Sequence, residues 1–325
     1  MIVPSGQRGA ALLTVLLLVA VMATIGTTAL DRIRVATRLA ANVTTTAQAR
    51  AWLGTAEILA AARIDDLLAA DPSQTTLAGG WLGVDRSIAL PDGAMVRARI
   101  EDGGNCFNLN GLVERQPDQR LAERPSARGQ FVGLMSVLGI APGEAERIAS
   151  SAADYIDSDS APLAGGAEDG ARGGVAIPPN QMMADASELR AVAGVTPRHF
   201  NILERWVCAL PTDEPAAINV NTLLVEQAPL LAMLAPGLLD VARARAQLGA
   251  RPADGFGSVL QFWSAPALRG IEIPQAMAQQ VKVRSAFFVL RAQVGAGDVD
   301  VRESALIDAR TTPARIVRRQ WGEAG

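Results

Sequence analysis

The chain has 325 residues, of which 49% are hydrophobic and 19% are charged, and its formal net charge is −3. This length allows two or three domains, and the dispersed basic residues provide no electrostatic footprint for nucleic acid. His199 is the only histidine, so a histidine-based metal site or catalytic triad would have to be centred on it. No Walker A, GxSxG, HExxH or dinucleotide-binding motif occurs, and we interpret the chain as non-enzymatic.

An apolar segment lies close to the N-terminus. Residues 8–30 read RGAALLTVLLLVAVMATIGTTAL, one arginine followed by an uncharged and mostly apolar run. A helix of this length rises ~33 Å at ~1.5 Å per residue, enough to cross a hydrocarbon core of ~30 Å. The run is longer than the ~7 to 15 apolar residues of a secretory signal. We therefore expect a single membrane-spanning helix over residues 10–34.

The charges that flank this segment do not establish its orientation. Arg8 and the amino terminus precede it, whereas Arg32, Arg34 and Arg38 follow it. Counting basic residues mildly favours the cytoplasmic side for the rest of the chain.

The helical pattern continues beyond the span to about residue 70. Apolar residues such as Leu39, Val43, Trp52 and Leu59 recur at near three and four positions. We expect the span and this stretch to form one long helix. Pro72 ends it, because proline cannot continue the hydrogen-bond ladder and disfavours helix in the residue before it.

Strands are expected on both sides of a helical region. Residues 86–90 and 94–102 alternate apolar and polar side chains and indicate a hairpin. The alternation returns at 281–294, 299–309 and 314–321. We expect these two groups of strands to pair in one antiparallel sheet, with the long N-terminal helix packed on it.

Between the strands, alanine- and leucine-rich segments bounded by proline or glycine predict short helices. They are residues 130–138, 142–156, 186–193, 197–207, 221–234, 238–247 and 257–265. The predicted fold class is α+β, with a large helical domain inserted into a strand-bearing domain.

The two cysteines, Cys106 and Cys208, are far apart and form no CxxC motif, so they suggest neither a zinc site nor a redox motif. If the body of the protein lies outside the cytoplasm, one disulfide is the natural interpretation. Closing a loop of about 100 residues would stabilise the fold by up to ~4.7 kcal/mol in the chain-entropy model. Two unrelated buried thiols are the alternative.

Carboxylates are densest in one glycine-rich segment, which contains Asp154, Asp157, Asp159, Glu168 and Asp169. Carboxylates this close repel one another unless a cation or basic groups neutralise them, and calcium accepts oxygen ligands from flexible loops. The spacing does not match an EF-hand. The alternatives are a solvated acidic loop, or a hydrolase that uses two of these aspartates as acid and base.

Residues 218–238 are similar to helix-hairpin-helix modules, which hold the DNA backbone through the amides of a glycine turn. Only one glycine, Gly237, is present in the turn, and the following helix offers only Arg243 and Arg245. We therefore favour a structural use of this hairpin over DNA binding.

Several segments occur together in a specific order. They are RGAALLTVLLLVAVM near the N-terminus, GGNCFNLN at 103–110, DYIDSDSAPLAGGAED at 154–169, ELRAVAGV at 188–195, CALP at 208–211 and INVNT at 218–222. In this order they resemble the K-type minor pseudopilins of the bacterial type II secretion system. The resemblance covers most of the chain and implies a pilin-like fold without enzymatic activity.

The resemblance implies processing and a place in a fibre. Prepilin peptidase would cut after Gly9, and Ala10 would then be methylated. Thr14 would be the fifth mature residue, where most pilins and pseudopilins have a glutamate that pairs with the amine of a neighbouring subunit. K-type members share this lack of glutamate, which suits the first subunit at the tip of the fibre.

The resemblance also implies ligands, partners and location. K-type members carry calcium in their helical domain, which assigns the ligands to Asp157, Asp159, Glu168 and Asp169, with Asp185 and Ser187 as lesser candidates. The expected partners are the I-type and J-type minor pseudopilins, the major pseudopilin, prepilin peptidase, and exoproteins or the secretin, but no nucleic acid. Together with the disulfide interpretation, the resemblance favours an inner-membrane protein with its body in the periplasm.

The implied domains are a leader (1–9), the transmembrane part of the helix (10–34), the first part of a pilin-like domain (35–111), an inserted helical domain (112–280) and C-terminal strands (281–325). Two alternative functions remain at this point. A type IV pilus-like minor pilin would share the leader and the sheet, and a membrane-anchored DNA-binding protein would use the helix-hairpin-helix segment.

Overall fold

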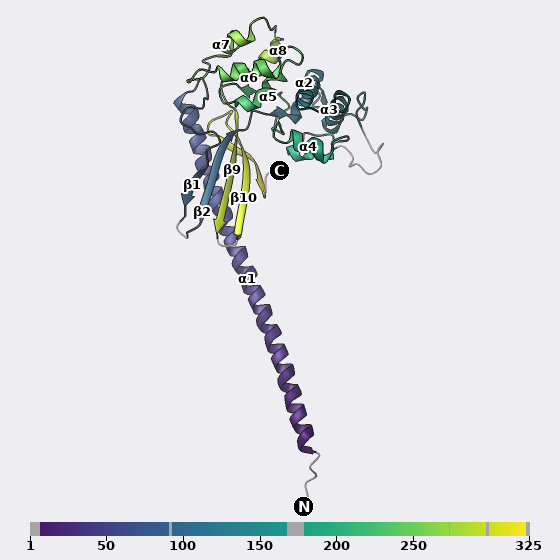
Figure 1. Ribbon diagram of the computed structural model, residues 1–325, viewed down its shortest axis with the longest axis vertical. Helices are drawn as coiled ribbons and strands as arrows, with labels where there is room; N and C mark the ends of the chain where they lie inside the picture. Colours follow the sequence, from purple (N-terminus) through teal and green to yellow (C-terminus); the bar gives the residue numbers. More distant parts are fainter. Residues whose placement is uncertain (1–6, 91–92, 168–178, 273, 297–298, 323–325) are drawn as a thin grey trace, which may run out of the picture.

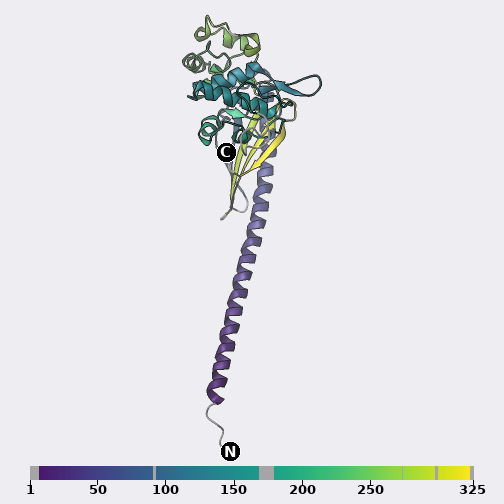
Figure 2. The same cartoon turned by 90° about the vertical axis from the view of Figure 1, so that its right-hand side faces the viewer.

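The computed structural model describes residues 7–90, 93–167, 179–272, 274–296 and 299–322. A 64-residue helix, α1 (Gln7–Ala70), runs into a body made of a five-stranded sheet and a group of short helices (Figure 1). The short helices lie at the end of the body that is farther from the N-terminus, in both views (Figure 2). The expected fold, a long helix on an antiparallel sheet with a helical insert, is confirmed.

The two halves of α1 have different surroundings. Every residue from 10 to 44 is exposed, so no other described part of the chain covers the apolar N-terminal half. From residue 49 onward one face is buried against the sheet, and its apolar residues lie three or four positions apart, as in an amphipathic helix. These residues are Ala49, Leu53, Ala56, Ala60, Ile64 and Leu68. The helix ends at Ala70, shortly before Pro72, as expected.

The sheet has the strand order β1-β2-β9-β10-β11, and all neighbouring strands are antiparallel. The strands are β1 (Arg86–Ala89), β2 (Met95–Asp102), β9 (Phe287–Ala296), β10 (Val299–Asp308) and β11 (Arg315–Trp321). Successive side chains point to opposite faces, so that Val96, Leu290 and Ala305 belong to the cluster packed with α1. The pairing of β2 with β9 brings the two ends of the helical insert together.

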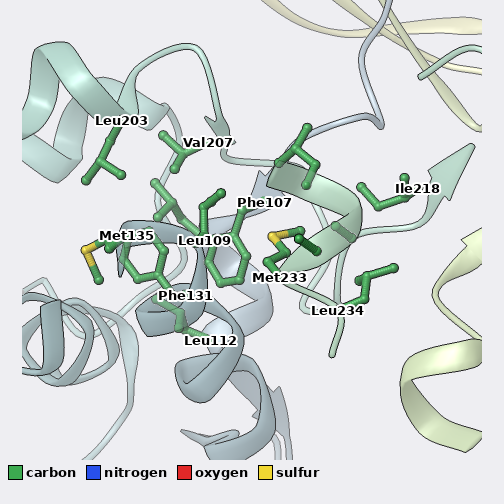
Figure 3. Close-up of a cluster of buried hydrophobic side chains, with 14 of the residues drawn as sticks. Phe107, Leu109, Leu112, Phe131, Met135, Leu203, Val207, Ile218, Met233 and Leu234 are labelled. Carbon is green, nitrogen blue, oxygen red and sulfur yellow. The ribbon is translucent and has the colours of Figure 1, made fainter. Parts of the chain in front are cut away.

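The insert has its own apolar core, which extends from Phe107 to Val281. Phe107 and Phe131 stack in this core, with ring centroids 4.7 Å apart (Figure 3). The α-helices are α2 (Pro125–Val137), α3 (Pro142–Ile156), α4 (Pro197–Leu203), α5 (Ala228–Ala232), α6 (Val241–Gly249), α7 (Val259–Trp263) and α8 (Gln275–Ala278). The 3-10 helices are η1 (Leu109–Leu112), η2 (Ala186–Ala191), η3 (Val225–Gln227) and η4 (Pro266–Leu268).

Pairs of very short strands connect these helices. They are β3 (Phe107–Asn108) with β6 (Val207–Cys208), β4 (Val113–Arg115) with β5 (Leu121–Glu123), and β7 (Ile218–Asn219) with β8 (Val281–Lys282). The helix predicted over residues 221–234 begins only at Val225, as η3 followed by α5. Residues 218–219 before it form the strand β7, which pairs with β8, and residues 220–222 form a turn. The sequence pattern did not reveal this parallel pairing, which joins segments about sixty residues apart.

Two pairs of asparagines, in the segments FNLN and INVN, hold the loops of the insert. The side chain of Asn110 accepts the N–H of Met183 and donates to the carbonyls of Met183 and Leu210. Asn221 binds the N–H and the carbonyl of Phe256 in the same two-sided way. Because one amide side chain both donates and accepts, these asparagines satisfy buried backbone groups that the short strands leave without partners.

Leu53→Ala tests the contact between α1 and the sheet, because Leu53 is fully buried there. We expect the soluble body, residues 36–325, to lose roughly 2–5 kcal/mol of unfolding free energy through the cavity that remains. Leu59→Ala is the matched control, since Leu59 is 56% exposed on the same helix, and it should change stability by no more than about 0.5 kcal/mol. Urea unfolding measures both variants, and equal losses would contradict this packing.

Candidate functional site

The N-terminal half of α1 is the described part of the chain that is long and apolar enough to cross a membrane. The expected processing residues, Gly9 and Ala10, lie at the beginning of this helix, and residues 1–6 of the leader lie outside the described residues. Thr14 donates its hydroxyl to the carbonyls of Ala10 (3.2 Å) and Ala11 (2.8 Å). The hydroxyl is therefore satisfied within its own helix and requires no partner from another chain.

Cys106 and Cys208 form a disulfide, with their Cα atoms 5.8 Å apart across a sequence separation of 102 residues. The bond lies beside the parallel pair of β3 and β6. It ties the beginning of the insert to its middle and suits an oxidising compartment outside the cytoplasm.

The acidic segment begins inside the last turn of α3, where Asp154 is fully buried. Its Oδ1 accepts the N–H of Leu163 at 3.1 Å. A Cβ atom at Gly166 would lie 1.9 Å from Oδ2 of Asp154, so only glycine allows the loop to close over this carboxylate. Burial raises the pKa of Asp154, and the negative charge of the nearby Asp159 adds to this effect.

The other acidic residues differ in their surroundings. Asp157 follows α3 directly and is buried, whereas Asp159 is exposed. Oδ1 of Asp159 accepts the N–H of Ala161 at 2.8 Å, and its backbone carbonyl accepts a hydrogen bond from Asn180 at 2.9 Å. The remaining expected ligands, Glu168 and Asp169, lie outside the described residues.

Asp185 and Ser187, the two lesser candidates for calcium ligands, lie at the start of the 3-10 helix η2. Oδ1 of Asp185 accepts the N–H of Ser187 at 2.9 Å and caps η2, and Arg318 lies 4.0 Å from its other oxygen. Burial opposes ionisation of Asp185, but the hydrogen bonds from Ser187 and the charge of Arg318 outweigh it, so its pKa is lowered. We attribute Asp185 and Ser187 to capping of η2.

The described residues test whether the acidic segment suits a cation. No group of three or more His, Cys, Asp or Glu side chains that could hold a metal ion occurs within the ranges the structure describes. Two oxygens near the segment are nevertheless buried and, within those ranges, accept no hydrogen bond: Oδ2 of Asp154 and Oδ1 of Asn180. Such oxygens fit the hard-oxygen chemistry of calcium.

The helix-hairpin-helix segment is occupied by internal contacts. In the turn between α5 and α6, the N–H groups of Leu238 and Leu239 both donate to the carbonyl of Ala235. Asp240 caps α6 and places a carboxylate at the terminus where a phosphate would have to bind. Two amides of the turn are therefore occupied and a carboxylate lies beside them, an arrangement that favours a structural use of this turn.

Sequence reasoning missed a charged cluster between α1 and the sheet, in which two buried glutamates lie beside an exposed arginine. Arg319 on β11 binds the carboxylate of Glu57 on α1 through Nε at 2.6 Å and through Nη2. Glu303 on β10 lies 3.7 Å from Nε of Arg319, and its side chain is 1% exposed. A signal existed for Glu57, which occupies a position on the apolar face of α1, but none identified Glu303.

The pKa values of the two glutamates move in opposite directions. Burial, followed by the neighbouring carboxylate of Glu57, raises the pKa of Glu303 to about 8. Burial also acts on Glu57, but its bonds to Arg319 outweigh it and lower the pKa. One arginine therefore neutralises one carboxylate, and the other carboxyl retains its proton near neutral pH.

The long partly exposed helix, the antiparallel sheet and the distal insert define a membrane-anchored, pilin-like protein with an inserted helical domain. Two family models, both described as type II secretion system (T2SS), protein K, match residues 105–212 and 218–284. The chain belongs to the type II secretion system protein K family. As a member of this pseudopilin family it is a structural protein and not an enzyme.

Individual relatives match nearly the whole chain. The type II secretion system protein K of Klebsiella pneumoniae is 34% identical over 319 residues, covering 97% of each chain. That of Dickeya chrysanthemi is 33% identical over 349 residues, again covering 97% of each chain. A solved structure, the GspK-GspI-GspJ complex from enterotoxigenic Escherichia coli, matches with a TM-score of 0.74 and 31% identity, over 85% of this chain and 96% of that chain.

Glu303 gives the stability a specific dependence on pH. Between pH 4.5, its ordinary pKa, and about 8, the folded chain holds a proton that the unfolded chain releases. Stability should therefore fall as the pH rises through this window. Glu303→Gln should reduce that fall, whereas Glu226→Gln, an exposed residue of the insert, should leave it unchanged. Urea unfolding of residues 36–325 at several pH values measures the slopes, and parallel slopes for all three proteins would contradict the assignment.

Proposed function

We propose that this chain is a minor pseudopilin that forms part of the pseudopilus tip and helps initiate pseudopilus assembly, for protein export across the outer membrane. The observation that carries the proposal is the position of the insert at the end of the body opposite the membrane-spanning half of α1 (Figure 1). Subunits that align their long helices would add along the axis of α1. The insert lies in that direction and would block addition above it.

The N-terminal half of α1 supports a terminal position in a second way. Carboxylates within a membrane cost ~2.5 to 3.5 kcal/mol on insertion scales unless they are paired. A subunit with a glutamate at the position of Thr14 would need a partner ahead of it, whereas the hydroxyl of Thr14 is satisfied by Ala10 and Ala11. A subunit of this kind can therefore be the first in the pseudopilus, with no subunit ahead of it.

The proposed location is the bacterial inner membrane, with a single span and the body in the periplasm. The exposed apolar half of α1 supports the span, and the Cys106–Cys208 disulfide supports a body in the periplasm. Prepilin peptidase would remove residues 1–9 by cutting after Gly9, and Ala10 would be methylated.

The proposed partners are the I-type and J-type minor pseudopilins, with the major pseudopilin below them. The structurally similar protein was solved in a GspK-GspI-GspJ complex, which supports the first two. The insert would offer its distal surface to exoproteins or the secretin.

We also propose that the acidic segment binds calcium as a structural ion. Asp157, Asp159, Glu168 and Asp169 are the proposed ligands, and the buried free oxygens of Asp154 and Asn180 support an oxygen-rich site there. Calcium would neutralise carboxylates that otherwise repel one another and would hold the segment against α3.

The two alternative functions receive less support. A type IV pilus-like minor pilin has no use for the large insert and its acidic segment. DNA binding through the helix-hairpin-helix would need free amides in the turn, whereas those of Leu238 and Leu239 bind Ala235.

Calcium should raise the melting temperature of residues 36–325, a fragment that retains every buried apolar residue of the described chain. A ligand that binds only the folded state stabilises it by RT ln(1 + [L]/Kd), so calcium at 100 Kd would contribute ~2.7 kcal/mol. Differential scanning calorimetry compares added calcium with excess chelator, after bound metal has been removed.

Asp157→Asn and Asp159→Asn should each reduce the calcium-dependent rise in melting temperature. Asp254→Asn, which neutralises an exposed aspartate of another loop in the insert, is the matched control and should retain the full rise. A rise that persists in the first two variants, or no rise in the wild-type chain, would reject the proposed site.

The tip position is tested by labelling the full chain in assembled pseudopili. The chain, co-produced with prepilin peptidase, the minor pseudopilins and the major pseudopilin, should be found by immunogold electron microscopy at one end of each filament. The intact mass of the same sample reports whether residues 1–9 have been removed. Label distributed along the filaments would contradict capping by the insert.

A further inference from the structure

The outward face of the sheet carries a group of arginines, which we call the arginine face. Arg97 and Arg99 on β2, Arg291 on β9 and Arg302 on β10 alternate with residues that face α1, so they point away from the helix. The side chains of Arg99, Arg291 and Arg302 are 39%, 40% and 45% exposed, respectively.

The insert covers one end of this sheet face and leaves the arginine face open. Leu306 and Phe287 on the outward face pack with Leu210 of the insert. Arg318 reaches from β11 to the carbonyls of Ala184 and Ala209. The arginines lie in the rows beyond these contacts, toward the end of the sheet that is nearer the N-terminal half of α1 (Figure 1).

Repulsion within the arginine face is only partly relieved. Arg99 and Arg291 are directly opposite each other on neighbouring strands, an arrangement that destabilises a sheet. Glu101 lies between them, 3.4 Å from Nε of Arg99 and 3.1 Å from Nε of Arg291. Oδ1 of Asp85 lies 3.7 Å from the same Nε of Arg99, so two carboxylates serve these two guanidinium groups.

Arg302 and Arg97 differ in their partners. Asp300 binds Arg302 at 3.2 Å and also accepts two hydrogen bonds from Gln293. Arg97 is exposed and has no ion pair or hydrogen bond with any residue that the structure describes. Each guanidinium presents five N–H donors and no acceptor, so this face has free capacity for oxygen acceptors.

The four arginines, together with Asp85, line an open hollow of about 490 Å³ on the sheet. Its walls are the guanidinium groups, and part of its floor comes from strands β9 and β10, at Ala292 and Glu303. A hollow of this size admits several carboxylate side chains, which guanidinium groups bind in paired, planar geometry.

The distance between the arginine face and the membrane argues against lipid headgroups as the oxygen acceptors that bind this face. Glu303, next to Arg302 in sequence, lies beside Arg319, which binds Glu57 on α1. Glu57 is 26 residues beyond Asp31, the first charged residue after the apolar segment, which corresponds to ~39 Å of helix. Charge interactions are largely screened beyond ~8 Å at physiological ionic strength.

We propose that the arginine face is a docking surface for an acidic protein segment, which inserts several Asp or Glu side chains between Arg97, Arg99, Arg291 and Arg302. The partner's carboxylates replace weak exposed ion pairs within the face and satisfy the donors of Arg97. Because this face points away from α1, docking leaves the helix free for assembly with other subunits.

The test uses the full chain in detergent and a fluorescein-labelled peptide of alternating glutamate and glycine. Fluorescence anisotropy should show one peptide bound per chain, with an affinity that falls as salt is added. Arg97→Ala together with Arg302→Ala should weaken binding about tenfold. The matched control removes the same charge from exposed positions on α4 and α6, by Arg198→Ala with Arg245→Ala, and should bind normally.

Charge reversal separates docking from a structural role. The variant with Arg97→Glu and Arg302→Glu should no longer bind the glutamate peptide and should bind a peptide of alternating lysine and glycine. The unchanged chain should bind the glutamate peptide more tightly than the lysine peptide. A thermal melting curve of each variant shows whether it still folds. If a double variant does not fold, the single variant Arg97→Gln is measured in its place.

Three results would overturn the proposal. They are equal binding by the arginine-face and control variants, no peptide binding at low salt, and stronger competition by inorganic phosphate or glycerol phosphate than by unlabelled glutamate peptide at equal ionic strength. The last result would assign the face to a phosphate ligand. None of them affects the tip position, which depends on the insert and α1.

Discussion

Burial of one face of α1 against the sheet is the contact on which the rest of the structure depends. The helix is apolar in its N-terminal half and amphipathic in its C-terminal half, and the body covers only the second part, between Ala49 and Leu68. This contact selects the inner face of the sheet and leaves the arginines on the other face. It also leaves residues 10–44 exposed to whatever surrounds the protein, and the hydrophobic effect requires that lipid or other helices cover them. Anchoring and assembly therefore follow from a helix that its own chain covers only in part.

The position of the insert depends on a second constraint, which is the pairing of β2 with β9. The insert leaves the sheet after Asp102 and returns before Phe287, so both of its ends meet at one end of the sheet. A buried polar network holds this junction: Asp102 accepts hydrogen bonds from Thr222 and Ser285, and Asn219 binds Asn105 and Ser285. The polar groups of this network come from both the end of the sheet and the insert, and they satisfy one another's hydrogen bonds. The network therefore fixes the direction of the insert relative to α1. A rigid direction is what a subunit needs if its insert is to limit growth of a fibre.

Much of the charge in this protein serves neither catalysis nor an exposed binding site. Glu57 and Glu303 are buried at the contact between α1 and the sheet, beside the exposed Arg319. The proton on Glu303 allows two carboxyl groups to share this one arginine. Asp154 is buried beneath a glycine loop. The arginine face differs from both, because its side chains are partly exposed. Function in this protein therefore depends on how surfaces are presented and not on a reactive group.

The amino-acid sequence by itself determined the long helix, its end before Pro72, the strands of the sheet and the family, because these depend on local hydrophobic periodicity, on proline and on short motifs. It also indicated the pairing of Cys106 with Cys208 and the acidic segment. Only the tertiary structure decided that residues 218–219 form a strand and that the helical segment after them begins at Val225. It also decided that the amides of Leu238 and Leu239 are occupied, that Glu303 lies beside Glu57 and Arg319, and that four arginines share one face of the sheet. These features depend on pairing between segments distant in sequence, such as β7 with β8 and β2 with β9. Local sequence carries no record of such neighbours, since a strand's pattern specifies which side chains share a face but not which strand lies beside it.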